Sequence, residues 1–256
     1  MKLLDKIFDY MELSDVVNFL EEIAPSELAE EFDIGRIGLT LNLENDVKRI
    51  AVALDPTEYV IKRAAEMGAN LLITHHTLIF HPINLIPRYL ADTLKIALGN
   101  EISLYSMHTN LDKAENGIND VLARKLGLSN IENCEIGRIG TIKPCSAENF
   151  ASHVSKCLNT HVQFVGRKEE IRKVMVFGGS GFRDEYLEFA KRNDVDAYVS
   201  SELKHDIIRS WEDMLLVDAT HYATENPGMQ ELCTILEDKL KLDVEFIEHN
   251  PFIKTL

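Results

Sequence analysis

Short runs of β-branched and apolar residues alternate along this chain with longer segments of helical periodicity, and this alternation constrains the fold more than any other feature. The expected strands are residues 49–54, 71–74, 102–107, 173–177, 197–200, 214–218 and 244–247. Alternation of this kind is typical of α/β architecture, in which helices cover a largely parallel sheet. The sequence therefore predicts an α/β fold with mostly parallel strands.

Two helices can be placed from the residues expected at their ends. Asp55 is expected to cap the first helix, with Pro56 at its first position and Gly68 just beyond its last turn. A second helix is expected over residues 227–241, where apolar residues recur at helical spacing. Asn226 suits its cap because a short polar side chain can accept a hydrogen bond from the first turn.

A faint internal repeat suggests two related lobes. Residues 48–76 and 172–203 share the order strand, turn, helix, strand and polar pair. The alternative is that any two strand–helix–strand units of an α/β chain align this well. We expect a first lobe at residues 1–130 and a second at 131–256, with an approximate boundary. The C-terminal segment either stays with the second lobe or packs back on the first.

Charge, hydropathy and cysteine content limit the function classes. The chain has 27 Lys+Arg against 42 Asp+Glu, a formal net charge of −15, which opposes general binding to the nucleic-acid backbone. Residues 67–87 carry no charged side chain, but their three histidines and two prolines favour a buried strand and a loop over a membrane span. The four cysteines form no CxxC pair, which indicates reduced thiols and a cytoplasmic location.

Potential metal ligands directly follow three of the expected strands. They are His75 and His76, then His108 and Asp112, and then His221 and Glu225. In open α/β sheets ligands bind at the carboxyl ends of strands, where loops distant in sequence converge. We therefore expect a metal site at these strand ends. The other histidines lack this setting and are expected to be solvated or structural.

The adjacent pair His75 and His76 bears on the number of metals. In an extended segment neighbouring side chains point to opposite sides, so one metal is not expected to take both comfortably. Two metals, or one metal and a different role for the second imidazole, remain open. Asp112 and Glu225 are the candidates for a carboxylate that bridges two cations. Imidazole and carboxylate donors without cysteine favour Fe, Mn, Co, Ni or Zn.

Several segments resemble the conserved blocks of a known family. They are HHTLIF (75–80), HTNLDKAENGIND (108–120), SELKH (201–205) and HYATENPGMQEL (221–232). These segments are similar to blocks of the Nif-three-like family, also labelled the GTP cyclohydrolase I type 2 homologue family. FDIGRIGL (32–39) and VALDPTEYVI (52–61) resemble its other blocks. The resemblance thus runs from about residue 10 to the C-terminus.

The resemblance implies a fold, a metal centre and an assembly. Members of the family have two α/β lobes with a dinuclear metal site in the cleft between them, and they assemble as homohexameric rings. Two divalent metal ions per chain would then be expected. Their ligands map onto His75, His76, Asp112, His221 and Glu225, with Glu225 at the bridging position.

The resemblance also implies roles for residues beside the metals. His108 matches a position near the metals, and Glu202 lies on the opposite lobe, where it could face the site. Two positions depart from the family pattern. Thr77 stands where a proline is common, and Asp206 stands where a second histidine is frequent. If that second histidine carries a proton, His205 would have to do so alone.

Three functions remain open at this point. The first is a metal-dependent hydrolase of an unknown small-molecule substrate, of cyclohydrolase, phosphoesterase or amidohydrolase type. Its catalytic residues would be Glu225, His108, Glu202 and His205. The second is a non-catalytic ring protein that handles metal or binds a partner, and the third is a nucleic-acid-binding protein. The glycine-rich segment 178–181 is interpreted as a tight turn, with an anion cradle as the alternative.

Overall fold

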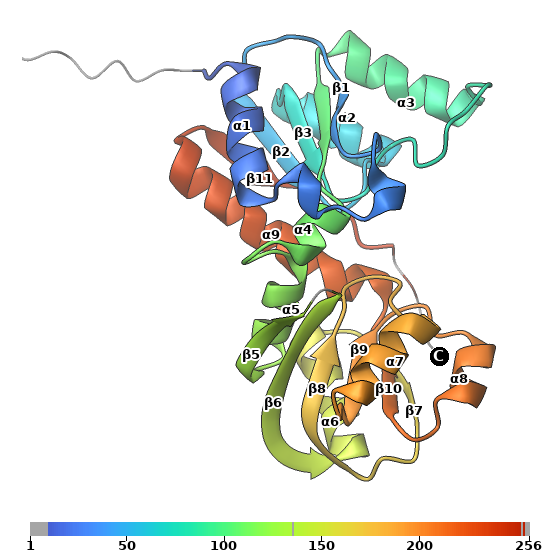
Figure 1. The fold of residues 1–256 in the computed structure, drawn as a ribbon. Coiled ribbons are helices and arrows are strands. Elements are labelled where there is room, and N and C mark those ends of the chain that lie inside the picture. Colours follow the sequence, from blue (N-terminus) through green and yellow to red (C-terminus); the bar gives the residue numbers. More distant parts are fainter. Residues whose placement is uncertain (1–9, 135, 252, 254–256) are drawn as a thin grey trace, which may run out of the picture. The chain divides into compact units, whose positions relative to one another are not determined.

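The computed structural model describes residues 10–134, 136–251 and 253 (Figure 1). Contacts between residues divide these into two units. Unit 1 comprises residues 10–111 and Met229–His249, and unit 2 comprises Asp112–Gly228 and the described residues from Asn250 onward. The chain therefore crosses between the units more than once, which a single boundary near residue 130 does not capture. Residues Met229–His249 group with unit 1.

Unit 1 is built on a five-stranded sheet in the order β1-β4-β3-β2-β11. The strands are β1 (Gly38–Leu41), β2 (Arg49–Ala53), β3 (Leu71–Thr74), β4 (Ser103–Ser106) and β11 (Asp243–Phe246). All neighbours pair in parallel except β1, which runs antiparallel along the edge of β4. β3 and β4 are buried at every residue, which is why they read as continuous apolar runs.

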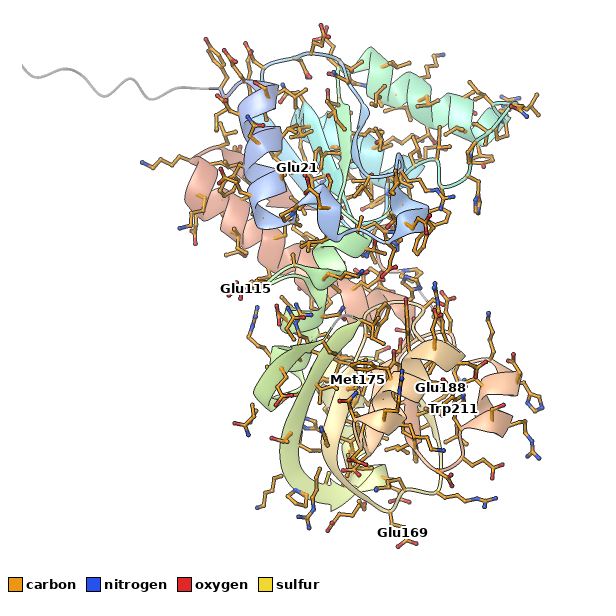
Figure 2. All side chains as sticks on the ribbon, in the orientation of Figure 1. Glu21, Glu115, Glu169, Met175, Glu188 and Trp211 are labelled. Carbon is orange, nitrogen blue, oxygen red and sulfur yellow. The ribbon has the colours of Figure 1, made fainter. Side chains whose placement is uncertain are left out.

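Helices pack their apolar faces against this sheet. They are α1 (Leu13–Ile23), α2 (Glu58–Met67), α3 (Arg88–Gly99) and, from Met229 onward, α9 (His221–Leu240), with two short 3-10 turns, η1 (Ser26–Leu28) and η2 (Glu31–Asp33). Val60, Ile61 and Leu72 belong to the apolar core of the unit. Glu21 lies on α1 (Figure 2). The Tyr105 hydroxyl donates to Glu21 Oε1 at 2.6 Å, which ties this helix to β4.

The predicted start of α2 is wrong by two residues. Thr57, not Asp55, is the cap, because its hydroxyl accepts a hydrogen bond from the Val60 amide at 3.3 Å. The predicted end is confirmed, since Gly68 adopts the left-handed conformation with φ of 74°. Asp55 instead turns its carboxylate to a histidine described below.

Unit 2 is built on a six-stranded sheet in the order β5-β6-β8-β9-β10-β7. The strands are β5 (Ser129–Cys134), β6 (Gly137–Ser146), β7 (Gln163–Val165), β8 (Glu170–Val176), β9 (Ala197–Ser200) and β10 (Leu215–Asp218). Only β8, β9 and β10 pair in parallel, and the other neighbours pair antiparallel. The expectation of largely parallel strands holds for unit 1 and fails here, because β5, β6 and β7 are mostly polar or exposed and gave no strand pattern.

Helices cover both faces of this second sheet. They are α5 (Ile118–Lys125), α6 (Ala147–Leu158) and α7 (Asp184–Arg192), and a short helix α8 (His205–Ser210) follows β9. Alternate residues of the central strands enter two separate apolar clusters, one with Phe150 of α6 and one with Leu187 of α7. Met175 of β8 is buried in the second cluster, whereas Glu188 of α7 is exposed (Figure 2). The α/β class is thereby confirmed in both units.

The predicted start of the last long helix is also wrong. α9 begins at His221, and Pro227 lies inside it. The turn before the proline is helical, as the Thr224 amide donates to the Thr220 carbonyl at 3.2 Å. Proline has no N–H to donate and its ring crowds the carbonyl one turn earlier, so it is more often found at a helix start. Here the helix continues through Pro227, which the local pattern does not predict.

The uncharged stretch at residues 67–87 forms the end of α2, the buried strand β3 and a segment without helix, as expected. Within the part of the chain that the structure describes, none of the helices combines the length and the apolar character needed to cross a membrane.

Candidate functional site

Three histidines of unit 1 converge at the ends of neighbouring parallel strands. His75 and His76 directly follow β3, and His108 follows β4 just before the short helix α4 (Thr109–Lys113). Their possible ligand atoms all lie within 4.8 Å of one another, and their ring centroids are 5.0 to 5.6 Å apart. His75 is fully buried and the other two are partly exposed. This group, called here the histidine cluster, could hold a metal ion.

The expectation that His75 and His76 point to opposite sides is wrong. Their ring centroids lie 5.0 Å apart. β3 ends at Thr74, so the alternation of an extended strand no longer applies. Both histidine amides instead donate to the same Leu54 carbonyl oxygen, at 3.2 and 3.1 Å. This shared acceptor bends the backbone and lets both rings join one cluster.

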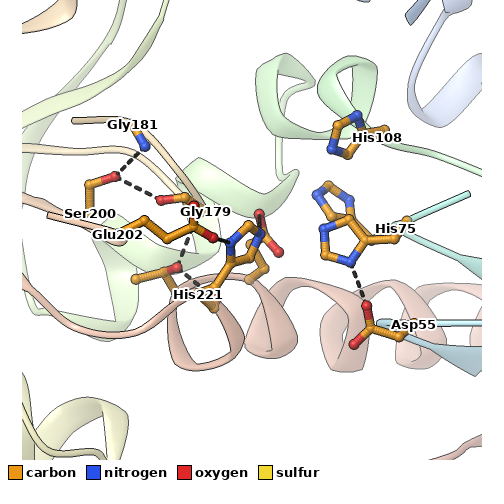
Figure 3. Close-up of polar contacts among 12 residues, drawn as sticks. Asp55, His75, His108, Gly179, Gly181, Ser200, Glu202 and His221 are labelled. Carbon is orange, nitrogen blue, oxygen red and sulfur yellow. Dashed lines mark hydrogen bonds and ion pairs between the residues drawn. The ribbon is translucent and has the colours of Figure 1, made fainter. Parts of the chain in front are cut away.

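Each imidazole of the histidine cluster is oriented in the same way, with Nδ1 against an oxygen atom. A carbonyl or an ionised carboxylate can only accept, so Nδ1 carries a proton and Nε2 is the nitrogen that could bind a metal. Metal-binding histidines in proteins show this arrangement, which fixes both tautomer and ring orientation. The acceptors for His75 and His108 are the Met107 carbonyl and Asp33 Oδ2, both at 2.8 Å. The acceptor for His76 is Asp55 Oδ1 at 2.7 Å, a contact drawn as a dashed line in Figure 3.

Asp33 is a candidate site residue that the sequence pattern does not predict. It is fully buried and accepts hydrogen bonds from His108 and from the Thr109 amide, the latter at 3.2 Å. Burial alone would raise the pKa of its carboxyl, but the hydrogen bonds from His108 and Thr109 outweigh it and lower the pKa. Asp33 lies in the segment FDIGRIGL, which resembles a block of the family, and this is the one feature of the sequence that could have indicated it. No local pattern connects Asp33 to a histidine 75 residues away.

A second set of candidate ligands lies in unit 2, on the first turns of α9. His221 and Glu225 are one helical turn apart, and His221 Nε2 lies 3.0 Å from Glu225 Oε1. On its other side, His221 Nδ1 lies 2.6 Å from Glu202 Oε1 (Figure 3). The sequence predicts a loop for these two candidates, whereas both are helical. Glu202 is therefore a partner of His221, with a left-handed backbone at φ of 63°.

The electrostatics of His221 follow from its two carboxylate neighbours. Burial would lower the pKa of this imidazole, but Glu225 and Glu202 outweigh it and raise the pKa to about 10. The pKa of Glu202 is lowered because the contact with His221 outweighs its own burial. At neutral pH both ring nitrogens therefore carry protons, and a metal bound at Nε2 would have to displace one of them.

The glycine-rich turn at residues 178–181 leaves space for the side chains of His221 and Glu225. A Cβ atom at Gly179 would lie 2.1 Å from Glu225 Oε1 and 3.1 Å from His221 Nε2, and the residue has φ of 70°. Only glycine fits that position. The amides of Gly178 and Gly179 donate to Asn119 Oδ1 at 2.8 Å and to Thr224 Oγ1 at 3.0 Å. Because these donors are already used, the segment is a tight turn and not an anion cradle.

The remaining predicted residues have different settings. Asp112 lies on α4, where it is buried and its carbonyl accepts from Asn119 Nδ2 at 2.9 Å. His205 is exposed at the start of α8 and forms no hydrogen bond or ion pair with any described residue. His153 Nε2 donates to the Leu126 carbonyl at 2.8 Å, which fits its expected structural role. The structure thus groups His75, His76 and His108 in unit 1. It groups Glu202, His221 and Glu225 in unit 2, where Asp112 is buried on α4 and His205 is exposed.

Comparisons with known proteins add to this geometry. The family model described as Duf34/NIF3 (NGG1p interacting factor 3) matches residues 11–251. A GTP cyclohydrolase 1 type 2 homolog from Methanocaldococcus jannaschii is 35% identical over 243 residues, covering 91% of this chain and 98% of the relative. A protein of the same name from Clostridium perfringens is 32% identical over 257 residues, covering 93% and 95%. The solved structure of reduced HcgD from Methanocaldococcus jannaschii has a TM-score of 0.83 at 34% identity, covering 94% of this chain and 99% of that one.

Proposed function

Because the chain belongs to the DUF34/NIF3 family, we propose that it is a metal-dependent hydrolase that holds two divalent metal ions per chain. The observation that carries the proposal is the shared orientation of four imidazoles. Four histidines, His75, His76, His108 and His221, each turn Nδ1 to an oxygen acceptor, so that Nε2 is the nitrogen that would bind a metal. The proposed ligands are His75, His76, Asp112, His221 and Glu225.

The residues present fit a metal of the first transition row. The donors are imidazole nitrogens and carboxylate oxygens, which suit Fe, Zn, Mn, Co or Ni. Gly179 supports the same conclusion, because the space that a Cβ would fill lies against Glu225 Oε1 and His221 Nε2. That the candidates of unit 1 and unit 2 serve one dinuclear centre, with Glu225 as the bridge, is the part of the proposal that rests on the family resemblance.

The chain's own residues would prepare this chemistry. When bound, the metals would supply Lewis acidity and lower the pKa of a water molecule. Asp33 and Glu202 hold the Nδ1 protons of His108 and His221, so these rings keep one orientation. The proposed proton carriers are His108, Glu202 and His205, in addition to the role of Glu225. His205 would act from its exposed position, with Asp206 beside it where relatives often have a second histidine.

The assembly and location are also proposed. A homohexameric ring is expected from the family resemblance, and exposed apolar side chains at Ile79, Ile83, Leu85, Ile86 and Tyr89 of unit 1 support burial between subunits. A cytoplasmic location is supported by the four free thiols. The substrate class stays open between cyclohydrolase, phosphoesterase and amidohydrolase reactions. The name of the relatives favours the first, whereas the family description favours a protein partner.

Metal analysis followed by a substrate panel tests the proposal. Full-length protein purified without added metal is expected to hold about two first-row ions per chain. Glu225→Ala should lose most of this metal, whereas Glu237→Ala, an exposed position on the same helix, should keep it. The metal-loaded protein should then hydrolyse one of the three substrate classes. Little metal after supplementation would overturn the proposal, and stable metal without turnover would favour the metal-handling function.

A further inference from the structure

Unit 1 contains a cavity of about 370 Å³ that the proposed metal chemistry does not use. Its walls are the segment 35–41, which includes β1, and the segment 77–82, which directly follows the histidine pair. Leu94 of α3 and Leu104 of β4 close it. Sites for small molecules are mostly apolar cavities of this size with a few polar groups that fix orientation.

Arg36 gives this cavity its chemical character. It is the one charged residue among the described residues that line the cavity, in a chain whose formal net charge is −15. Its guanidinium makes no ion pair with any carboxylate in the described part of the chain, and its Cζ lies 4.7 Å from the centroid of the Phe80 ring. A guanidinium held over an aromatic face presents its N–H groups at its edge, where a planar fork can receive an oxyanion.

The backbone that carries Arg36 also connects the cavity to the histidine cluster. Gly35 and Gly38 flank it with φ of 78° and 85°, and a Cβ at either would meet nothing within 4 Å. These glycines are therefore required by conformation, because they turn the chain sharply on both sides of Arg36. The Arg36 amide donates to the Asp33 carbonyl at 2.8 Å. The same short segment thus positions Arg36 and, through the Asp33 side chain, His108.

Phe80 makes a second connection within the same unit. Its ring meets the His108 imidazole edge-on, with centroids 5.9 Å apart and an interplanar angle of 87°. Phe80 therefore contacts both the guanidinium of Arg36 and an imidazole of the histidine cluster. A molecule held in the cavity by Arg36 would lie next to this cluster.

We propose that this cavity binds a small organic oxyanion, a phosphate or a carboxylate, whose charged group pairs with Arg36 and whose apolar or planar body packs against Phe80 and Leu78. As a binding site the proposal stands on unit 1 alone. The further claim, that such an oxyanion is the substrate class of the metal centre, rests on the proposed function. The lining offers apolar side chains for the body and one cation for the oxyanion, so an uncharged molecule of the same shape should bind more weakly.

Calorimetric titration of the full-length protein tests this with three probes of similar shape. The probes are phenyl phosphate, benzoate and benzyl alcohol, and excess chelator is present so that the anions cannot bind a metal directly. At least one anion should bind about tenfold more tightly than benzyl alcohol, and which one does so identifies the oxyanion. Anions that bind no better than benzyl alcohol would overturn the proposal.

Matched substitutions locate the binding. Arg36→Met should weaken anion binding about tenfold to the level of benzyl alcohol, and Arg36→Lys should restore part of it through a point charge. Arg88→Met is the control, because Arg88 lies in the same unit with a side chain 94% exposed and pairs only with Asp92 among the described residues. Unchanged anion binding by Arg36→Met, or an equal loss in Arg88→Met, would overturn the proposal.

Metal analysis of the same variants separates this inference from the proposed function. If Arg36-dependent anion binding occurs in a protein that takes up no metal, the binding site stands and the hydrolase fails. If metal-dependent turnover occurs and Arg36→Met leaves KM for the anionic substrate unchanged, the hydrolase stands and this inference fails.

Discussion

The histidine cluster of unit 1 and the His221–Glu225 pair of unit 2 position candidate metal ligands by different means. In unit 1 each imidazole turns Nδ1 to an oxygen acceptor, and the rings are set by strand ends and a shared carbonyl. In unit 2 one imidazole has carboxylates at both nitrogens, and its pKa is raised to about 10. Unit 2 would therefore have to release a proton from His221 when a metal binds.

The largest expected effect comes from filling the space beside the unit 2 pair. Gly179→Ala should reduce metal affinity more than about 100-fold, because the new Cβ would lie 2.1 Å from Glu225 Oε1 and force that carboxylate away. Elemental analysis and a competitive chelator titration measure the loss. Gly127→Ala is the control, since Gly127 also has φ of 70° but a Cβ there meets nothing within 4 Å. Both variants should lose about 1 kcal/mol of stability from backbone strain, and only Gly179→Ala should lose metal. Equal metal content would contradict the role of this space.

The second largest effect is expected from disturbing the orientation of the His108 ring in unit 1. Asp33→Asn should lower metal affinity about 10- to 100-fold, because an amide can present its N–H₂ to His108 Nδ1 and disturb the tautomer that the carboxylate fixes. Chelator competition at pH 7 measures this loss, and circular dichroism verifies the fold. The matched change at His76, Asp55→Asn, should show a loss of the same kind. If neither change alters the affinity, the orientation of these rings does not depend on their carboxylate partners.

The proton at His221 should make metal binding depend on pH. Since the raised pKa keeps His221 protonated below about pH 10, metal affinity should rise about tenfold per pH unit from neutral pH upward. In the metal-free protein the stability of the fold changes in the opposite direction, because it falls as the pH rises. The ion pairs of His221 stabilise the fold fully below pH 6.5, and this stabilisation is lost as the pH rises through about 10.

Glu202→Gln isolates the unit 2 contribution to this dependence. Removing one of the two carboxylates lowers the pKa of His221, so the rise in affinity with pH should level off at a lower pH. Chelator titrations at several pH values, with calorimetric counting of released protons, measure where it levels off. A rise that levels off at the same pH in this variant would place the displaced proton on another residue.

The contrast between the two units also explains which features the sequence could predict. β3 and β9 have the predicted bounds, because buried parallel strands read as continuous apolar runs. β5 and β7 were missed because their residues are largely exposed and alternate weakly. Elements are encoded locally where burial is complete, and edge strands depend on neighbours that no local pattern reveals.

The same difference between local patterns and contacts distant in sequence applies to the candidate site. His75 and His221 stood out because an imidazole next to a strand end is a local pattern. Asp33, Asp55 and Gly179 were missed because each acts on a residue distant in sequence, and only the fold brings the two together. Asp55 was even assigned a different role, as a helix cap, since aspartate before Pro56 fits that pattern equally well.

The smallest expected effect comes from removing a partly buried carboxylate elsewhere in unit 2, which tests whether any such loss releases metal. Asp196 Oδ2 accepts from the amides of Arg172 and Lys173, both at 2.9 Å, and Lys168 pairs with its other oxygen. Burial would raise the pKa of Asp196, but these contacts outweigh it and lower the pKa. Asp196→Asn should therefore cost about 1–2 kcal/mol of stability at pH 7 and leave metal content unchanged.

The pH dependence of that cost gives a second readout. A carboxyl with a lowered pKa stabilises the fold above its ordinary value of 3.8 and loses this contribution as the pH falls through the lower folded value. Urea denaturation of Asp196→Asn and the unaltered protein should thus differ most near neutral pH and converge in acid. Metal loss in Asp196→Asn would show that metal content follows the general stability of unit 2. Retained metal, beside its loss in Gly179→Ala, would assign that loss to the geometry around Glu225.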